Sequence, residues 1–587
     1  MILLLLVVML CFPGVGGAPP RPLSLGVHTI LDGAMLASTS GCTLQPGAVH
    51  KDFRPAVVRE HPWEAILGFY SAVAFVPARL SSSGVAQWHA YYTCAWADLY
   101  TAPPSLCVAV SKDAGATWSK PLLSFYPWTG INGTEPPAPT NIVFRTQNNS
   151  FSGSVLVDAR PEAPREEAFT LGFEASLDGQ PPRLPYAARS SDGLCFESWD
   201  AAVARGPLLN LSTFSDTNLA LVSAAGQQGQ RTVLMAGRKD NASGGSKVDG
   251  GMAYCASSSG PHRAPLGTLL ECASGSGSSC NVSSRTWPAP RQLLPLGYPD
   301  DDQCLDTYNF PAISLGPDAA FNGSASWVAL PSSIRHLPAA QSRAPIPRAS
   351  NNDGFMDARL AASRDGWTWS LSARDAFLPR GVGVRDEASG LFNGSGSDLD
   401  AGFVYVANNG MLDPDAAASP PPAVPSPWVQ ILYWGGQTTH AGGGAFWYML
   451  PNAFAGLLRA RVRREGWMAL SSPRTDTGAG WAATVPLLLP PASDQQLIVL
   501  RLNAEVDASG NLTVQLQDAD TGQPLGGFSH GDCMPLRGNG VRQSVAWGGD
   551  RGTWLGGNPA LPNASTPIVL NFSMVHAKVY AWEMALV

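Results

Sequence analysis

The chain has 587 residues, a formal net charge of −7, and 38 Lys and Arg residues against 45 Asp and Glu. The cationic residues are scattered among prolines and glycines, and no segment resembles the basic stripe that binding to phosphate backbones requires. Composition and charge therefore exclude a dedicated nucleic-acid-binding protein. The length predicts more than one domain.

The chain begins with an apolar run, Met1–Phe12, that is too short to cross a bilayer and is followed by small residues at Gly14–Ala18. This pattern predicts a secretory signal peptide over residues 1–18. No later stretch is apolar over the ~18 residues that a membrane helix needs, so we expect no membrane partner. The expected location is secreted or extracellular, with the cell wall and the vacuole as further destinations of the secretory pathway.

Sequons and cysteines are also typical of a secreted protein. Nine cysteines remain beyond Cys11 in the leader, and an oxidising compartment would pair most of them, with Cys94–Cys107 and Cys272–Cys280 as local candidates. No spacing typical of zinc binding occurs, so we expect neither a metal nor a cofactor. N-glycosylation sequons are present at Asn132, Asn148, Asn210, Asn241, Asn281, Asn322, Asn393, Asn511, Asn563 and Asn571.

A unit of three or four short β-rich strands recurs from Ala72 onward, and several copies end in a Ser-x-Asp-Gly-like turn followed by an aromatic residue. The second copy of this unit is expected to start with a strand at Asn141–Phe144. Five copies with few helical periods between them predict an all-β fold with a five-bladed β-propeller over residues 19–470. Evenly spaced strands after Ser471 predict a C-terminal β-sandwich over residues 471–587.

The turn at the end of these units matches the Asp-box pattern S-x-D-x-G-x-T-W in full at Ser111–Trp118. Shortened forms occur at Ser191–Phe196 and Ser363–Trp369. Asp and Ser at these positions bond to nearby backbone groups and fix a hairpin turn, while the aromatic residue packs between sheets. We therefore interpret Asp113 as a structural residue.

Acidic residues precede four of the expected innermost strands, whose starts surround the central funnel of a propeller. Cleavage of a glycosidic bond needs two opposed carboxyls, one protonated and one ionised, and crowded carboxyls in a partly dry pocket differ in pKa. These residues are therefore candidate catalytic acids, although Asp also caps turns at strand starts. The candidates are Glu64, Asp216, Asp306 and Asp400.

Four further residues are candidates for substrate binding, because the same pattern places them near the funnel: Asp158, Arg238, Tyr308 and His440. Arg238 and His440 could bind sugar hydroxyls. A lone Arg or His is more often a satisfied structural group, so this alternative remains open for both residues.

Three segments, Cys107–Gly115, Asp306–Pro311 and Arg359–Gly366, together with Leu525–Cys533 near the C-terminus, resemble proteins related to glycoside hydrolase family 32. The resemblance implies a five-bladed propeller followed by a β-sandwich, which agrees with the repeat pattern. The acid-bearing family segments WMNDPNG, RDP and ECP are absent from this chain. No catalytic residue is therefore carried over, and neither sucrose nor fructan is implied.

The leading hypothesis is a secreted glycoside hydrolase that acts on a polysaccharide or glycan end, with a carbohydrate as its substrate or ligand. A carbohydrate-binding or cell-wall interaction protein that has lost catalysis is the first alternative. The second is a sialidase, suggested by the Asp-box and by Tyr308–Pro311, although it would need an arginine in place of Asn309 and six blades. The sequence predicts neither the glycan nor the oligomeric state.

Overall fold

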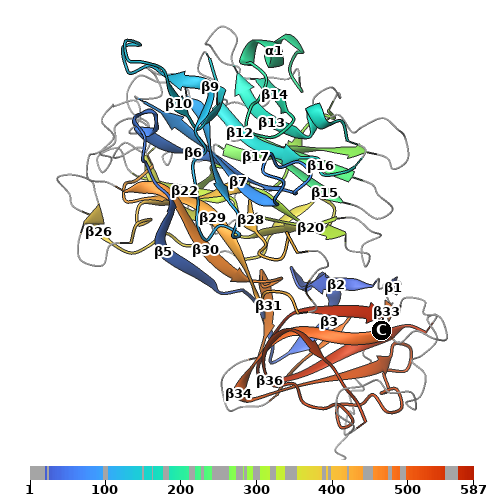
Figure 1. The fold of residues 1–587 in the computed structure, drawn as a ribbon. Helices are drawn as coiled ribbons and strands as arrows, with labels where there is room; N and C mark the ends of the chain where they lie inside the picture. Colours follow the sequence, from blue (N-terminus) through green and yellow to red (C-terminus); the bar gives the residue numbers. More distant parts are fainter. Residues whose placement is uncertain are drawn as a thin grey trace, which may run out of the picture.

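In the structure, a computed structural model, nearly all of the regular secondary structure is β-strand, and the strands form a larger upper body and a smaller lower body (Figure 1). Its one described α-helix is the short α1 (Trp199–Ala204). The described residues are 20–586 with gaps at 23–24, 97–103, 148–150, 162, 176–183, 210–218, 226–230, 241–262, 273–281, 283–286, 295–304, 318–324, 338–352, 374, 386–391, 394–397, 419–421, 423, 441–453, 473–478, 490–497 and 549–565.

The upper body is a β-propeller, as the repeat pattern predicts. Its inner strands pack beside one another in chain order, and the last of them returns beside the first, in parallel, at Asn408 and Ala72. The number of blades in the whole chain stays a prediction, because parts of the chain lie outside the described residues. The inner strands are β6 (Ile66–Val76), β12 (Phe151–Val157), β15 (Ala220–Ala225), β20 (Ala312–Pro317) and β28 (Phe403–Leu412).

Each inner strand begins an antiparallel sheet that extends outward as a blade. The first blade continues with β7 (Gln87–Ala95), β8 (Ser105–Ser111) and β11 (Ile142–Arg145), and the second with β13 (Phe169–Ala175) and β14 (Leu184–Ser190). The third continues with β16 (Arg231–Asp240), β17 (Arg263–Cys272) and β18 (Arg291–Gln292), and the fourth with β21 (Ala325–Ala329), β24 (Ala361–Ser363) and β25 (Trp369–Leu371). The last continues with β29 (Trp428–Gly436), β30 (Ala455–Arg463) and β5 (Val49–Val57).

The last blade is completed by β5, a strand from the N-terminal part of the chain that pairs antiparallel with β30. Joining the two ends of the ring within one sheet leaves fewer exposed strand edges, which is how propellers avoid edge-to-edge aggregation. Asn141–Phe144, which we expected to begin the second blade, instead forms the outermost strand of the first, because β11 pairs with β8. Strand alternation indicates a strand but not its neighbour.

The lower body is the C-terminal β-sandwich, built around two long strands, β34 (Ile498–Asp518) and β36 (Ile568–Leu586), that pair along their length. It also contains β31 (Met468–Ser471), β32 (Gly480–Thr484), β33 (Leu487–Leu488) and β35 (Gly538–Ser544). Four N-terminal strands join the same sheet: β1 (Arg21–Pro22), β2 (Gly26–Thr29), β3 (Leu36–Ser40) and β4 (Thr43–Pro46).

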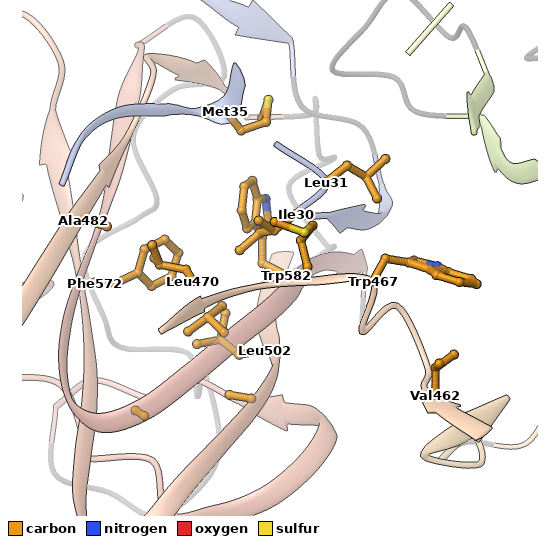
Figure 2. Packing of buried hydrophobic residues seen from close by; sticks show 14 of the residues in the cluster. Ile30, Leu31, Met35, Val462, Trp467, Leu470, Ala482, Leu502, Phe572 and Trp582 are labelled. Carbon is orange, nitrogen blue, oxygen red and sulfur yellow. The ribbon is translucent and has the colours of Figure 1, made fainter. Parts of the chain in front are cut away.

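These N-terminal strands change the expected division of the chain, which assigned residues 19–470 to the propeller. β2 pairs with β36, β3 with β32 and β4 with β31, so residues 21–46 belong to the sandwich and the propeller starts with β5. Figure 2 shows the reason: Ile30, Leu31 and Met35 pack in one buried cluster with Trp582 and other side chains of the C-terminal strands.

The remaining elements lie outside the blades. β19 (Leu305–Thr307), β22 (Ser332–His336) and β23 (Gly354–Ala358) form a ladder that joins β28 at Met356. The others are the hairpin of β9 (Leu123–Trp128) and β10 (Ala138–Thr140), the pair β26 (Val384–Arg385) and β27 (Phe392–Asn393), and the 3-10 turns η1 (Gly33–Met35), η2 (Pro62–Glu64) and η3 (Arg165–Glu167). Within the described ranges, no helix is long and apolar enough to cross a membrane.

The Asp-box turns have the structural role expected of them. Asp113 accepts hydrogen bonds from Ser111 Oγ at 2.8 Å and Thr117 N at 2.8 Å, and Trp118 Nε1 donates to Gly115 O at 3.1 Å. Asp365 holds the fourth-blade turn in the same way, and Asp192 that of the second blade. In the second blade the capping serine is Ser190, one residue before the expected Ser191.

Of the two expected disulfides, Cys94–Cys107 is present within the first blade, while Cys280 lies outside the described residues.

Candidate functional site

Glu64 ends η2 immediately before inner strand β6, and its side chain is fully buried. Oε2 accepts two backbone N–H hydrogen bonds, at 3.0 and 3.2 Å, and forms an ion pair with Lys120 Nζ at 2.7 Å. Oε1 accepts from the Tyr92 hydroxyl at 2.7 Å and from Asn141 Nδ2 at 3.3 Å. Both carboxylate oxygens are therefore bound by groups of the protein itself.

These contacts determine the protonation of Glu64. Burial raises the pKa of its carboxyl, but the hydrogen bond and charge of Lys120, with the Tyr92 hydroxyl bond, bring that pKa below its ordinary value. A carboxyl with a lowered pKa is ionised at neutral pH and cannot serve as a general acid.

Asp400 has a closely similar environment before the inner strand β28. It is 2% exposed, and its Oδ2 lies 2.6 Å from Lys51 Nζ and accepts from the Tyr433 hydroxyl at 2.9 Å. Burial of Tyr433 and the adjacent Asp400 charge raise the pKa of the Tyr433 hydroxyl, so this group remains a hydrogen-bond donor.

The two carboxylates thus share one arrangement, an ion-paired triad of acid, tyrosine and lysine. Tyr92 and Tyr433 are each the sixth residue of the second strand of their blades, β7 and β29. Lys51 lies on the outermost strand β5, and Lys120 follows the Asp-box turn after β8. Because neighbouring strands are ~4.8 Å apart, a carboxylate that reaches these partners extends outward over its blade, away from the propeller axis.

A second carboxylate, Asp398, lies beside Asp400, and sequence reasoning did not select it. A Cβ atom on Gly381 would lie 2.5 Å from Asp398 Oδ2 and 2.6 Å from Asp400 Oδ1, so these two oxygens are no more than about 5 Å apart. Asp398 Oδ2 accepts from Val382 N at 2.9 Å, and Asp398 N donates to Val382 O at 3.0 Å. The backbone of Gly381 and Val382 therefore covers this pair, and only glycine fits between the two carboxylates.

Two of the predicted sugar-binding residues, Tyr308 and His440, lie together. Their ring centroids are 4.6 Å apart in an edge-on arrangement, and both side chains are buried. His440 N donates to Gly354 O at 2.8 Å, and Tyr308 N donates to Ser332 O at 2.7 Å, which fixes the pair to the β19–β22–β23 ladder. Since neither ring faces solvent, the pair supports the loop before β20 rather than presenting a binding surface.

Three of the predicted residues are described in part or not at all. The backbone of Asp306 lies in β19 opposite Ile334 of β22, and that of Arg238 lies in β16 opposite Pro265 of β17. Their side chains are outside the described residues, as is the whole of Asp216. The roles assigned to these three residues stay predictions.

Asp158 lies apart from the strand-start residues, because it follows the end of the inner strand β12. It is bound to Arg160, with Nε to Oδ1 at 3.0 Å and Nη2 to Oδ2 at 2.8 Å, and its backbone N donates to Ala168 O at 2.8 Å. Asp158 and the strand-start carboxylates are therefore at opposite ends of the propeller.

A cavity of about 230 Å³ lies among the inner strands towards this end, lined by late residues of β6, β12 and β28, the middle of β15 and the start of β20. Most of the side chains that line it are apolar. Phe75, Val157 and Met411 are among them, and the described lining contains no charged side chain. Asn408 and Asn409 of β28 donate to Leu219 O and Leu221 O, at 3.4 and 3.1 Å, and so connect the last blade with the third across the centre. Asn409 also lines the cavity.

Sequence reasoning missed the partners of the strand-start acids. Tyr92 and Tyr433 occupy equivalent positions in their strands, so an alignment of the blades would have revealed them. Lys51 and Lys120 carry no such signal, because each reaches its acid from a different segment of its blade. Within the described ranges, no group of three or more His, Cys, Asp or Glu side chains is placed to hold a metal ion.

No known protein family and no curated protein matches the sequence of this chain. Among solved structures, it is similar to an N-acetylgalactosamine deacetylase from F. plautii in complex with blood group B trisaccharide, with 12% identity, a TM-score of 0.38, and coverage of 73% of this chain and 97% of that chain. It is also similar to a thermostable family-43 glycoside hydrolase, with 12% identity, a TM-score of 0.35 and coverage of 71% and 96%.

A third similar structure belongs to the GH130 family of mannoside phosphorylases, which contains glycoside hydrolases, with 10% identity, a TM-score of 0.36 and coverage of 71% and 94%. The fold itself defines the class: the chain is a β-propeller protein with a C-terminal β-sandwich. The more specific resemblance to family 32 is not among the comparisons above, and it stays a proposal.

Proposed function

We propose that this chain is a secreted glycoside hydrolase-like protein that acts on a polysaccharide or glycan at the strand-start end of the propeller. The observation that supports this most directly is that two of the four strand-start acids are held in ion pairs within the protein. Glu64 and Asp400 are held in ion-paired triads, whereas Asp216 and Asp306 precede the inner strands of the third and fourth blades, which are neighbours. Glycosidic cleavage requires two carboxyls, and Asp216 and Asp306 are the two remaining candidates.

In this proposal Asp216 and Asp306 divide the chemistry between them. One carboxyl donates a proton to the departing glycosidic oxygen, and the other attacks the sugar carbon or activates a water molecule. Two carboxyls in one partly dry site raise the pKa of one relative to the other, which separates acid from base. Tyr308 follows Asp306 by two residues and packs against His440. Tyr308 and His440 act as positioning residues for the strand that carries Asp306.

The choice of this end of the propeller rests on polarity. The cavity at the other end is lined by apolar side chains such as Phe75, Val157 and Met411 and by Ser223, Ser314 and Asn409, and its described lining contains no carboxylate. The candidate catalytic acids precede the inner strands instead. A glycan site is therefore expected where the loops before the inner strands meet.

A carbohydrate-binding protein without catalysis is the second candidate, and one observation favours it. Both strand-start acids with described side chains, Glu64 and Asp400, already hold a lysine and a tyrosine hydroxyl. If Asp216 and Asp306 are ion-paired in the same way, no free carboxyl remains for acid catalysis.

The sialidase alternative gains no support from Tyr308–Pro311. Asn309, which stands where the sialidase segment has arginine, is buried, donates to Val406 O at 3.3 Å and accepts from Ser332 N at 2.8 Å. The Asp-box turns, which also suggested it, are hairpin turns with Asp113 and Asp365 in structural roles.

Secretion and the family assignment are part of the same proposal. The leader over residues 1–18 and the sequons predict export, and the Cys94–Cys107 disulfide is of the kind that persists in oxidising compartments. The segments that resemble family 32 relatives include Asp306–Pro311, which contains one of the two proposed acids.

The test is hydrolysis of a panel of plant, algal and animal glycans by the full secreted chain, with release of new reducing ends as the readout. We expect Asp216→Asn and Asp306→Asn each to lower kcat by about 10²–10⁴-fold on the substrate found, because each removes a proton donor or acceptor. Asp375→Asn is a matched control, since Asp375 is an exposed residue of the fourth blade.

Turnover unchanged by both Asp216→Asn and Asp306→Asn would remove the catalytic assignment. Binding of a glycan without any release of reducing ends, measured by calorimetry on the same panel, would favour the non-catalytic candidate.

A further inference from the structure

The hairpin of β9 and β10 projects from the first blade and exposes large apolar side chains. Leu122, Phe125 and Ile131 are 56%, 53% and 66% exposed. Leu122 immediately precedes β9, Phe125 lies on β9, and Ile131 lies in the connection between β9 and β10. A group attached at the tip of this hairpin would cover Ile131.

A tight turn forms the tip of this hairpin. Gly133 N donates to Gly130 O at 3.2 Å, so Ile131 and Asn132 occupy the two central positions of a β-turn. Gly133 has a φ of +68°, which only glycine adopts readily. Asn132 is exposed, as are Gly133 and Thr134, and these three residues form an Asn-x-Thr sequon beside Ile131.

The other sequons with described side chains differ from this one. Asn571 lies in the middle of β36 with strands paired on both sides, and its amide forms a hydrogen bond with His530. Asn511 lies in β34, where its side-chain oxygen is buried. Thr513, the third residue of that sequon, is also buried and bonds to His530 Nδ1 at 3.0 Å. A glycan at either position would displace native contacts.

We propose that Asn132 carries an N-linked oligosaccharide that covers the apolar tip of the β9–β10 hairpin, and that Asn511 and Asn571 carry none. In the transfer, Asn132 Nδ2 loses a proton and forms a bond to C1 of the first sugar. The bond between C1 and the phosphate oxygen of a lipid-linked oligosaccharide pyrophosphate breaks, and the lipid pyrophosphate leaves. The sugars attached at this point extend over Ile131 and the adjacent apolar side chains.

The test uses the full chain secreted from a eukaryotic host, treated with peptide N-glycosidase in H₂¹⁸O and analysed by peptide mass spectrometry. We expect the ¹⁸O label at position 132 and none at positions 511 and 571. The variant Thr134→Ala removes the sequon but retains Asn132, and we expect it to bind a hydrophobic dye at least twofold more strongly than the glycosylated chain. Adding Ile131→Ser and Phe125→Ser to this variant should reverse the increase.

An unlabelled Asn132 in the secreted chain, whether or not the remaining sequons are occupied, would overturn the proposal. So would occupancy of Asn511 or Asn571 in folded protein. Equal dye binding by the glycosylated chain and Thr134→Ala would show that the glycan does not cover the apolar side chains.

Discussion

Asp400 is a buried carboxylate whose charge is matched by Lys51, and such a pair stabilises a protein only while both partners are present. We expect Lys51→Met to lower the free energy of unfolding by about 3–5 kcal/mol, because it leaves the Asp400 charge buried and unpaired. Tyr433→Phe should cost about 1 kcal/mol, since it removes one hydrogen bond to that charge. Urea denaturation monitored by tryptophan fluorescence measures both.

Lys112→Met is a suitable control for this comparison, because Lys112 is an exposed residue of the Asp-box turn. If Lys51→Met were as stable as Lys112→Met, the Asp400 carboxylate would not depend on its ion pair. It would then return as a candidate catalytic acid.

Protonation of the buried His89 makes the stability of the protein depend on pH. His89 is fully buried between Gln87 and Tyr91, and burial lowers its pKa from 6.5 to about 4, although the charge of Asp192 acts in the opposite direction. The unfolded chain therefore binds a proton at higher pH than the folded chain does. The contribution of neutral His89 is complete above pH 6.5 and is lost progressively as the pH falls towards 4, by about 3 kcal/mol in all.

We expect the variant His89→Gln to lack this component, so its stability should fall less than that of the wild type between pH 6.5 and 4. Thermal unfolding at a series of pH values compares the two. If the stability of the wild type and of His89→Gln changed with pH in parallel, His89 would be protonated at a similar pH in the folded and the unfolded chain.

At the scale of strands and sheets, the connection between β30 and the sandwich depends on Arg463, which is 3% exposed. Its Nε donates to Asn503 Oδ1 at 2.6 Å, its Nη2 donates to Ala504 O at 3.1 Å, and a further bond reaches Asn539. The guanidinium also lies over the Tyr580 ring at 4.9 Å. This side chain therefore belongs to the propeller by sequence and to the sandwich by its contacts.

We expect Arg463→Met to leave buried partners unpaired, at about 1–3 kcal/mol for each group. The two bodies should then unfold in two separate transitions, which scanning calorimetry detects. Arg461→Met serves as the control, because Arg461 lies on the same strand but is exposed, with its guanidinium over the Trp428 ring. A single transition in Arg463→Met at the wild-type temperature would contradict this role.

At the scale of the whole molecule, the sequence was sufficient to predict the β-propeller, the sandwich and the Asp-box turns. These features depend on local patterns: the alternation of each strand and the hydrogen bonds of Asp113 or Asp365 to their own turns. The position of residues 21–46 was not predictable in this way. Their strands pair with segments more than 400 residues away, and alternation does not specify a partner.

The candidate site was predictable only as a set of positions before the inner strands. The direction of each carboxylate depends on a cation from elsewhere in the blade, and the sequence gives no sign that Lys120 reaches Glu64 or that Lys51 reaches Asp400. Closure of the ring by β5 brings Lys51 to its position. Strand pairing between segments far apart in the sequence therefore determines which cation lies beside each acid.

The most direct test of the proposed active site is a crystal structure of the Asp306→Asn variant with a bound oligosaccharide, in which the separation of the two proposed groups is measured. We expect Asp216 and the residue at position 306 to flank one glycosidic bond about 5–10 Å apart, with Glu64 and Asp400 still ion-paired with Lys120 and Lys51. An oligosaccharide bound away from the strand starts, or an Asp216 carboxylate directed outward onto a lysine, would contradict this expectation.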